Sequence, residues 1–383
     1  MKQLEIKTLE YFNKITADPG QEARLWKNET GGKVFGFLLP DVPEELIHAA
    51  GFFPFGIYGG DKGIPLSDAH LQFWTCSYIR SSFARALGGE LDFLDGLIIP
   101  HKCDTSRMLM GIWHHKMPLS FMDNFRPPRQ VERASARNYY SGELKRLKTK
   151  LEEYRGKEIT TEELKQSIKL YNSNRTLLRK LFDLHRETPD LLGSRELYNI
   201  IKASMVIPRE KLGAKLTLLL EELSPYTSSQ SGLPKIKLFI SGTFLEPLDI
   251  ADYIEESGGT IVGDDLKNGS RYIYGDVAED GDPLENFIAR QLSAMPSASF
   301  DINNNLRSDF LLKEIRTQKA DGIILLHLKY CEPENYDYHD MKTAMEQAGI
   351  PVQKIETEFG ETSLGQLRTR VQAFVEMLSG ELK

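Results

Sequence analysis

The sequence predicts an α/β protein with two doubly wound parallel-sheet lobes, which a helical segment joins and which face each other across a cleft. In both outer thirds of the 383-residue chain, short apolar runs alternate with helical segments, as in parallel sheets. The two outer thirds also share the same order of features, and the middle third is rich in Lys, Glu, Arg and Leu at helical spacing. We expect an N-terminal lobe at 1–135, a helical segment with a linker at 136–232 and a C-terminal lobe at 233–383.

Strands, helix ends and loops alternate in the first lobe. Its predicted strands are Lys33–Leu39, Pro54–Tyr58 and Asp95–Pro100. A helix starts near Glu44 and ends before Gly51, because glycine favours the left-handed conformation at the end of a helix. The third strand leads into a loop from His101 to Asp104.

The second lobe repeats this plan. Its predicted strands begin at Ile236, Thr260, Asp321 and Pro351, its predicted helices are Pro247–Glu256 and Tyr338–Ala348, and a loop from His327 to Cys331 follows the third strand. The stretch HAAGFFPFGIYGGD parallels EESGGTIVGDD, and LDGLIIPHKC parallels ADGIILLHLKYC. These parallels fit either a duplicated lobe or the similar strand ends and helix ends that α/β domains have in common.

The middle of the chain is expected to bridge the two lobes. Leu144, Leu147 and Leu151 have the spacing of a helix that buries one face. The Ser- and Pro-rich stretch at 224–234 is typical of a linker into the second lobe.

Composition limits the possible classes of function. A hydrophobic content of 40%, a charged content of 27% and a net charge of −7 are those of an ordinary soluble protein. No run of Lys and Arg with interleaved aromatics suggests nucleic-acid binding. Because no signal peptide and no run of about 18 apolar residues is evident, we expect no membrane association and a cytoplasmic protein. Three cysteines far apart in the sequence argue against a disulfide framework.

The positions of the three cysteines suggest a shared site. Cys103 and Cys331 each follow an Asp-Gly pair and an apolar run, so each lies just past the carboxyl end of a predicted strand, where open α/β sheets bind ligands. Cys76 precedes Ile79, Phe83 and Leu87, whose helical spacing places it at or near a helix N-terminus. The positive end of the helix dipole favours the thiolate, which is the form that ligates metal.

Three thiolates suit a cubane iron–sulfur cluster with one iron open to substrate. Four thiolates would complete an ordinary electron-transfer site, whereas an open iron can act as a Lewis acid on a substrate oxygen. The alternative is three unrelated buried cysteines, since free cysteine is among the most buried residue types. The pattern of residues leaves both interpretations open.

Several stretches resemble the 2-hydroxyacyl-CoA dehydratase and benzoyl-CoA reductase family. They are VPEELIHAAGFFPFGIYGG, CSYIRSSFARALGGELDFLDGLIIPHKCDTSR and YCEPENYDYHDMKTAMEQAGIPVQKIE. The resemblance runs from about residue 30 to the C-terminus and is weakest in the helical middle. It implies a heterodimer of two related two-lobed subunits, each with a [4Fe–4S] cluster on three cysteines in the cleft. On this chain those cysteines are Cys76, Cys103 and Cys331.

The resemblance also implies a reaction and its partners. A separate ATP-hydrolysing iron–sulfur activator supplies low-potential electrons, and the substrate is an acyl-CoA. In the dehydratases one electron converts the thioester carbonyl to a ketyl radical, the hydroxyl is expelled, and the electron is returned. In the reductases the electrons stay in the product and dearomatise its ring. Because this chain has no G-x-x-x-x-G-K-[ST] and no G-x-G-x-x-G pattern, we do not expect it to bind ATP through such a loop.

No catalytic acid or base is assigned from the sequence. The polar residues nearest the cysteines in sequence are His101, Asp104, Thr105, Arg107, His327 and Glu332. Local hydrogen bonding in loops explains each of them more simply than catalysis, and His114 and His115 are expected to be surface or packing residues of a helix.

Three functions follow from these patterns. The first is the smaller, β-type subunit of a 2-hydroxyacyl-CoA dehydratase, a lyase of anaerobic metabolism. The second is a subunit of an ATP-dependent benzoyl-CoA reductase, an oxidoreductase. The third, from another class, is a two-lobed small-molecule binding protein that closes on its ligand without chemistry.

Overall fold

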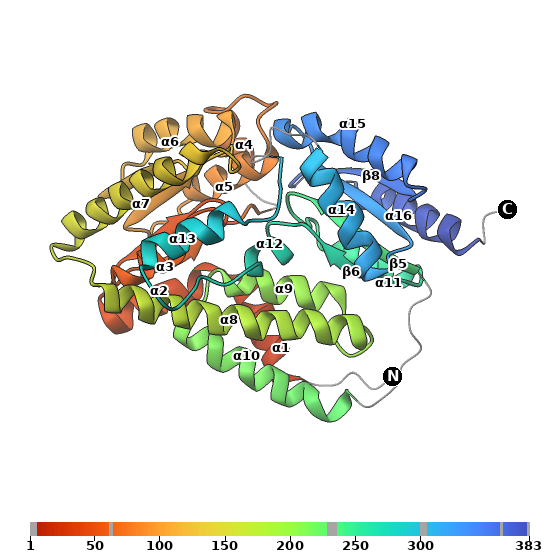
Figure 1. The fold of residues 1–383 in the computed structure, drawn as a ribbon, viewed down its shortest axis with the longest axis horizontal. Helices are drawn as coiled ribbons and strands as arrows, with labels where there is room; N and C mark the ends of the chain where they lie inside the picture. The colour runs from red at the N-terminus through yellow and green to blue at the C-terminus, as the bar shows by residue number, and fades with distance from the viewer. Residues whose placement is uncertain (1–5, 61–63, 228–235, 299–304, 361–362, 381–383) are drawn as a thin grey trace.

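Two four-stranded parallel sheets, one in each lobe, form the framework of the protein (Figure 1). The computed structural model describes residues 6–60, 64–227, 236–298, 305–360 and 363–380. The first sheet has the order β2-β1-β3-β4, with β1 Val34–Phe37, β2 Phe53–Gly56, β3 Gly96–Pro100 and β4 Phe121–Phe125. The second has the order β6-β5-β7-β8, with β5 Ile236–Gly242, β6 Gly259–Asp264, β7 Gly322–Leu328 and β8 Val352–Thr357. The predicted fold class of two doubly wound parallel-sheet lobes is confirmed.

Helices connect and cover the strands of each lobe. In the first lobe these are α3 Glu44–Ala49, α4 Ile64–Asp68, α5 Ser77–Leu87 and α6 Asp104–Lys116. In the second they are α11 Asp249–Glu256, α14 Asn305–Gln318, α15 Glu332–Gln347 and α16 Leu364–Ser379. The helices α12 Ser270–Ile273 and α13 Pro283–Leu292 lie between β6 and β7 in the chain but pack on the helical middle of the molecule. The expected glycines follow α3, α11 and α15, where Gly51, Gly258 and Gly349 have φ values of 79°, 85° and 71°.

The middle of the chain is helical, as predicted. It consists of α7 Ala134–Arg155, α8 Thr161–Glu187, α9 Ser194–Ser204 and α10 Arg209–Leu223. The N-terminal helix α1 (Lys7–Ala17) packs against α9 and α10, and α2 (Gly20–Thr30) follows it. In Figure 1, α8, α9 and α10 lie together beneath the two lobes. The domain boundaries at 135 and 232 stay a prediction. The boundary at 232 and most of the predicted linker lie outside the described residues.

Two local predictions were wrong. The loop expected from His327 starts two residues later, because His327 and Leu328 belong to β7, where the His327 side chain is buried. The helix expected from Tyr338 begins at Glu332, directly after Cys331. Pro333 lies in its first turn, where proline is favoured because no backbone N–H is required there.

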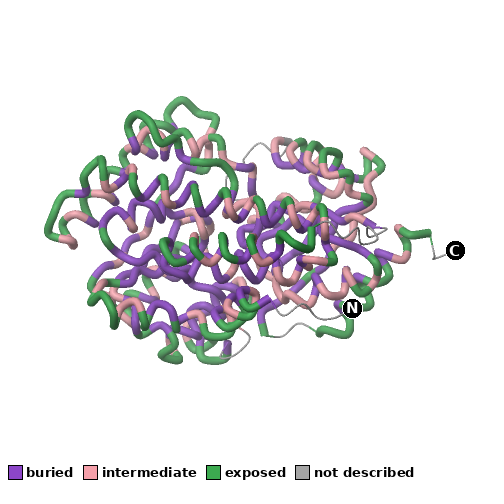
Figure 2. The backbone as a smooth tube through the Cα atoms, turned by 90° about the horizontal axis from the view of Figure 1, so that it is seen from below, coloured by how far each residue is buried: buried purple, intermediate pink, exposed green. Residues whose placement is uncertain are grey.

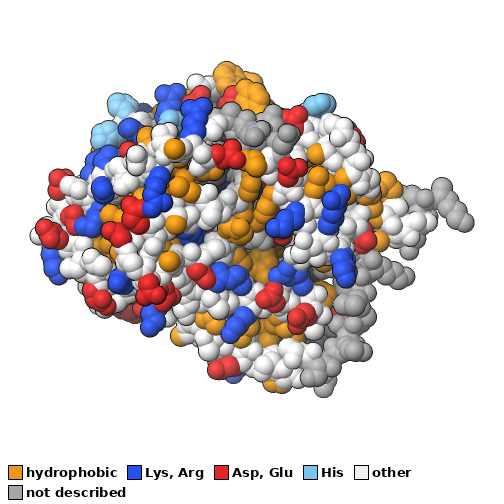
Figure 3. All heavy atoms as spheres, viewed as in Figure 1, with side chains coloured by type: hydrophobic (Ala, Val, Ile, Leu, Met, Phe, Trp, Pro, Cys, Tyr) orange, Lys and Arg blue, Asp and Glu red, His pale blue; other side chains and the backbone are white. Residues whose placement is uncertain are grey.

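Burial is continuous through the centre of the molecule (Figure 2). One core cluster joins the first sheet to the helical segment, with Phe35, Phe37, Leu178 and Leu216 among its members. The second sheet has a separate apolar cluster on each face. Figure 3 shows positive and negative side chains intermixed over the face that it presents. No helix in the described ranges combines the length and the apolar character that crossing a membrane requires.

Candidate functional site

The three cysteines lie at the start of three different helices. Cys76 precedes α5, Cys103 precedes α6 and Cys331 precedes α15, each as the N-cap residue. All three line one pocket between the lobes, which we call the cysteine pocket. Because the two sheets have the same strand order, Cys103 after β3 and Cys331 after β7 occupy equivalent positions. The fold thus brings together three residues that the sequence separates, while their role as ligands stays a prediction.

Hydrogen bonds hold two of these sulfur atoms in place. The Ser106 backbone N–H donates to Cys103 Sγ at 3.5 Å, and the Cys103 N–H donates to Ser106 Oγ at 3.2 Å. This reciprocal pair is a capping box in which a thiol takes the part of the usual hydroxyl or carboxylate. In the second lobe, Thr243 Oγ1 at the end of β5 lies 3.6 Å from Cys331 Sγ.

The electrostatics of the cysteine pocket oppose three free thiolates. Burial raises the pKa of Cys76 well above its usual range, and the neighbouring Cys331 and Cys103 raise it further. Burial, with the Glu334 carboxylate next, raises the pKa of Cys331 to about 12. Hydrogen bonds from the backbone N–H groups of Tyr78 and Ile79, in the first turn of α5, act to lower the pKa of Cys76. A cation bound at the sulfur atoms would favour the thiolate forms of Cys76 and Cys331.

Both lobes contribute residues to the wall of the cysteine pocket. The first lobe contributes Leu39 and Ile79, which are apolar, and Tyr78, whose ring stacks on Phe244 of the second lobe at 4.4 Å between centroids. From the second lobe, Gly242 closes the end of β5, where an added Cβ would lie 2.1 Å from the Leu326 carbonyl oxygen. Only glycine therefore fits at this position of the wall.

Charged side chains in the wall are held by partners. Asp41 lies between two lysine side chains, since Lys102 Nζ is 3.3 Å from its carboxylate and Lys267 Nζ also bonds it. Burial lowers the pKa of Lys102 well below its usual range, although the Asp41 carboxylate acts against this. On the other side, Arg307 Nη1 donates to Glu334 Oε2 at 2.8 Å, and both residues are at least nine-tenths buried. These pairs place cations and carboxylates next to the thiols at fixed positions.

A wider hollow opens outside the cysteine pocket. Its lining includes Asp104, Thr105, Arg107 and Glu332, which the sequence analysis had singled out, and Thr105 and Glu332 reach the cysteine pocket as well. Trp74, with 58% of its surface exposed, stands at the same hollow.

The predicted histidines lie elsewhere. His101 and His327 line neither of these two spaces within the described part of the chain. His114 and His115 are exposed in the last turn of α6, as expected.

The site does not have the geometry of a single-metal centre. In the segments that the structure describes, no three His, Cys, Asp or Glu side chains form a group that could hold one metal ion. A mononuclear site needs its ligand atoms about 2–2.3 Å from one point. A cubane cluster differs, because separate iron atoms each take one thiolate.

Sequence reasoning missed several residues of the pocket wall. Thr243 follows the end of β5 and Lys102 adjoins Cys103, so the strand-end rule could have found both. Glu334 stands in the Cys-Glu-Pro-Glu motif, where Glu332 was singled out instead. Lys267 and Arg271 carry no sequence signal, because they approach the pocket only through the packing of the two lobes.

The fold and the site define a class of protein: a two-lobed α/β protein with three thiols in one pocket between the lobes. Residues 41–378 match the family model described as 2-hydroxyglutaryl-CoA dehydratase, D-component. The chain belongs to this family, as its resemblance predicted.

Similar proteins include subunits of both enzyme types. A benzoyl-CoA reductase subunit of Thauera aromatica is 33% identical over 81% of this chain and 82% of its own length. The lactoyl-CoA dehydratase subunit beta of Anaerotignum propionicum is 30% identical over 97% of this chain and 98% of its own length. The (R)-phenyllactyl-CoA dehydratase beta subunit of Clostridium sporogenes is 27% identical over 96% and 97%. The similar proteins are thus enzyme subunits.

Proposed function

We propose that this chain is the β-type subunit of a 2-hydroxyacyl-CoA dehydratase and holds a [4Fe–4S] cluster on Cys76, Cys103 and Cys331. The observation that carries the proposal is the convergence of three helix N-caps, all cysteines, on one pocket between the lobes. The chain aligns with nearly the full length of two dehydratase beta subunits, which supports the assignment as a β-type subunit. The proposed assembly is a cytoplasmic heterodimer with a homologous subunit, served by an ATP-hydrolysing iron–sulfur activator.

The proposed reaction balances without net electron consumption. One electron from the activator enters the thioester carbonyl of a 2-hydroxyacyl-CoA, and the resulting ketyl expels the hydroxyl. Loss of a proton from the neighbouring carbon completes the water molecule, and the electron is recovered as the enoyl-CoA forms. When bound, the cluster would supply low-potential electron transfer and an open iron for an oxygen ligand.

The protein's own residues would prepare the site for this chemistry. Tyr78 and Phe244 close the pocket with stacked rings, which limits the access of water. Thr243 and Ser106 orient two of the sulfur atoms, and hydrogen bonds to sulfur tune the reduction potential of such clusters.

Iron analysis tests the ligand set. Anaerobically purified protein should contain about four iron and four sulfide per chain. Replacing Cys76, Cys103 or Cys331 with serine should remove most of both, whereas the control His114→Ala should keep them, since His114 is exposed on the last turn of α6. Full iron in all three serine variants would refute the assignment.

A benzoyl-CoA reductase subunit is the second candidate. It is favoured by the 33% identity to the Thauera aromatica protein, although this match covers 82% of the relative rather than nearly all of it. Turnover should require a second subunit, ATP and the activator in either case. With these components present, release of water from a 2-hydroxyacyl-CoA would support the dehydratase, and ring reduction of benzoyl-CoA would support the reductase.

A further inference from the structure

A second cavity adjoins the cysteine pocket between the lobes. It lies between the loop that follows β1 and the helices α12 and α13. Its wall shares Lys267, Arg271 and Ser297 with the cysteine pocket, so the two spaces are neighbours. We call this cavity the inter-lobe chamber.

The carboxylates in the chamber wall are already paired. The Asp41 carboxylate is held by Lys102 and Lys267, and these ammonium groups keep its pKa below the usual range although burial raises it. Glu45 accepts a hydrogen bond from Arg175 Nη1 at 2.7 Å. The acceptors of the wall therefore have protein partners.

Two polar groups in the same wall lack a partner among the described residues. Ser297 Oγ and Gln291 Nε2 are buried, and neither has a hydrogen-bond partner among the described residues. Ser297 is only 5% exposed. A buried polar atom without a partner is rare in native proteins and points to an unseen ligand or water. Gln291 Nε2 can only donate and the Ser297 hydroxyl can donate, so both suit a ligand that brings acceptor oxygens.

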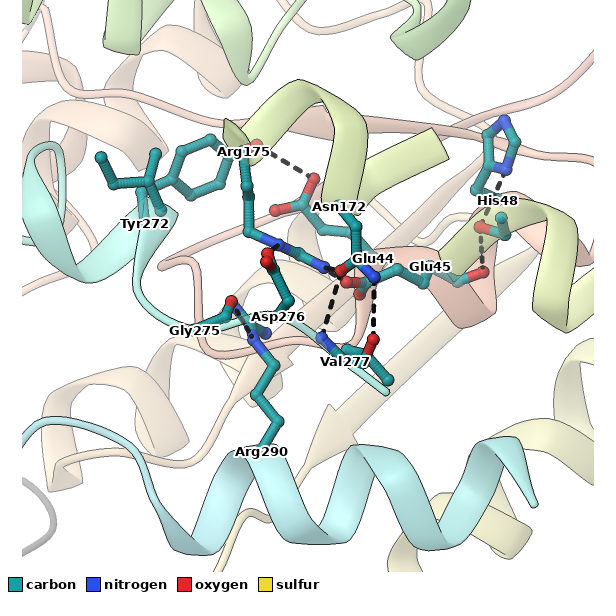
Figure 4. Close-up of polar contacts among 12 residues, drawn as sticks. Glu44, Glu45, His48, Asn172, Arg175, Tyr272, Gly275, Asp276, Val277 and Arg290 are labelled. Carbon is teal, nitrogen blue, oxygen red and sulfur yellow. Dashed lines mark hydrogen bonds and ion pairs between the residues drawn. The ribbon is translucent and has the colours of Figure 1, made fainter. Parts of the chain in front are cut away.

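Cations reinforce this preference. Arg290 extends from α13 into the wall, where its Nε donates to the Gly275 carbonyl at 3.2 Å (Figure 4). Lys267, whose side chain is 10% exposed, brings a second ammonium group to the wall, where it is ion-paired with Asp41. Phe287 and Met295 supply apolar contacts between the polar groups, as the carbon skeleton of an organic anion requires.

We propose that the inter-lobe chamber binds an anionic oxygen group of the substrate, with Gln291 and Ser297 as donors and Lys267 and Arg290 as countercharges. Only the substrate class, an acyl-CoA, is taken from the proposed function. The anionic group has two possible sources, which are a carboxylate at the far end of the acyl chain and a phosphate of the CoA. Either would lie beside the cysteine pocket, because the two spaces share wall residues.

Calorimetric titration of the full chain under anaerobic conditions distinguishes the two sources. If the chamber holds an acyl carboxylate, glutaryl-CoA should bind about tenfold or more tightly than butyryl-CoA, because hydrogen bonds to charged groups are strong. If it holds a phosphate, CoA should bind tighter than dephospho-CoA by a similar factor. In either case the variants Gln291→Leu and Ser297→Ala should remove most of the difference.

Stability measurements separate binding from structure. Because neither donor has a protein partner in the described residues, both variants should keep the melting temperature of the natural protein. Gln372→Leu, an exposed change on α16, is the matched control and should alter neither binding nor stability. If Gln291→Leu fails to fold, Ser297→Ala carries the test alone.

Two outcomes would overturn the assignment of the chamber. The first is equal affinity within both pairs, glutaryl-CoA with butyryl-CoA and CoA with dephospho-CoA, or no binding of any of the four. The second is a difference in affinity that both Gln291→Leu and Ser297→Ala retain. These outcomes are separable from a failure of the proposed function, since binding needs neither cluster nor activator. Discrimination between the ligands without turnover would count against the proposed function alone. Iron and turnover without discrimination would count against the chamber alone.

Discussion

At the residue scale, Glu44 and Glu45 show how two neighbours can carry opposite pKa shifts. Burial raises the pKa of Glu44, although its carboxylate lies 2.5 Å from Arg209 Nη2. Burial acts on Glu45 in the same direction, but the charges of Arg175 and Arg290 and the hydrogen bond from Arg175 together outweigh it, so the pKa of Glu45 is lowered. Figure 4 shows this contact, in which Arg175 of α8 meets the start of α3. The pair joins the helical segment to the first lobe.

Replacing Arg175 with methionine should destabilise the protein by about 3–5 kcal/mol, because it leaves the buried Glu45 charge without its closest partner. Arg179→Met is the matched control on the next turn of α8, where a half-exposed arginine pairs with Asp276. This change should cost at most about 1 kcal/mol. Urea unfolding at neutral pH measures both, and equal losses would contradict the burial argument.

The same variant has a predicted pH dependence. Because the folded-state pKa of Glu45 is lowered, its contribution to stability is present above the unfolded pKa of about 4.3 and is lost as the pH falls through the folded value. The difference in unfolding free energy between the natural protein and Arg175→Met should therefore shrink as the pH falls toward the lowered folded pKa of Glu45, because the unfolded pKa is common to both proteins. A constant difference across acid pH would show that Arg175 acts through packing.

At the scale of elements, one ion cluster attaches α7 to the edge of the first sheet. Asp123 of β4 accepts from Arg146 at 2.6 and 2.8 Å and from Lys150 at 2.8 Å. Its side chain is 1% exposed, and although burial raises its pKa, these two partners lower it overall. The cluster explains how β4 can carry a charge on a buried face.

Arg146→Met should reduce stability by about 1.5–3 kcal/mol, the usual range for hydrogen bonds to a charged group, since Lys150 still pairs with Asp123. Lys145→Met, one residue earlier and exposed, should change stability by less than about 0.5 kcal/mol. Hydrogen exchange of the β4 amides should increase in the first variant and not in the second. Unchanged protection of β4 would mean that α7 is held by its apolar face alone.

At the scale of the whole molecule, several contacts cross between the lobes besides the shared pocket. Arg80 of α5 lies 3.3 Å from Glu358, which follows β8, and both side chains are buried. The Phe359 N–H donates to Ser77 Oγ at 3.1 Å. The proposed cluster would add to these contacts between the lobes. Metal ligands drawn from separate elements contribute to the free energy with which those elements dock.

Exposure to air should destroy the proposed cluster and loosen the second lobe. The expected sign is faster proteolytic cleavage in the linker around 228–232, a segment outside the described residues, as the visible absorbance bleaches. Arg80→Met should add to the effect, since it removes a direct contact between the lobes. A cleavage rate that stays constant after complete loss of iron would show that the cluster does not brace the lobes.

The sequence by itself predicted the two lobes, most of their strands and the position of each cysteine. These features have local causes. Buried parallel strands are short apolar runs, and glycine is favoured just after the end of a helix. Once a strand is located, the sequence also gives the position of a cysteine that comes directly after it. The polar edge strand β4 escaped prediction, because Asp123 and Asn124 interrupt its apolar pattern and the burial of Asp123 depends on its partners in α7.

Only the tertiary structure decided which side chains share a space. Cys76, Cys103 and Cys331 meet because two sheets of the same strand order present equivalent edges to one cleft. Gln291 and Ser297 are ordinary polar residues in the sequence, and their missing partners become visible only when α13 and the following loop pack against the first lobe. Periodicity reports how each segment is buried, whereas contacts between residues a hundred or more positions apart depend on how the lobes dock.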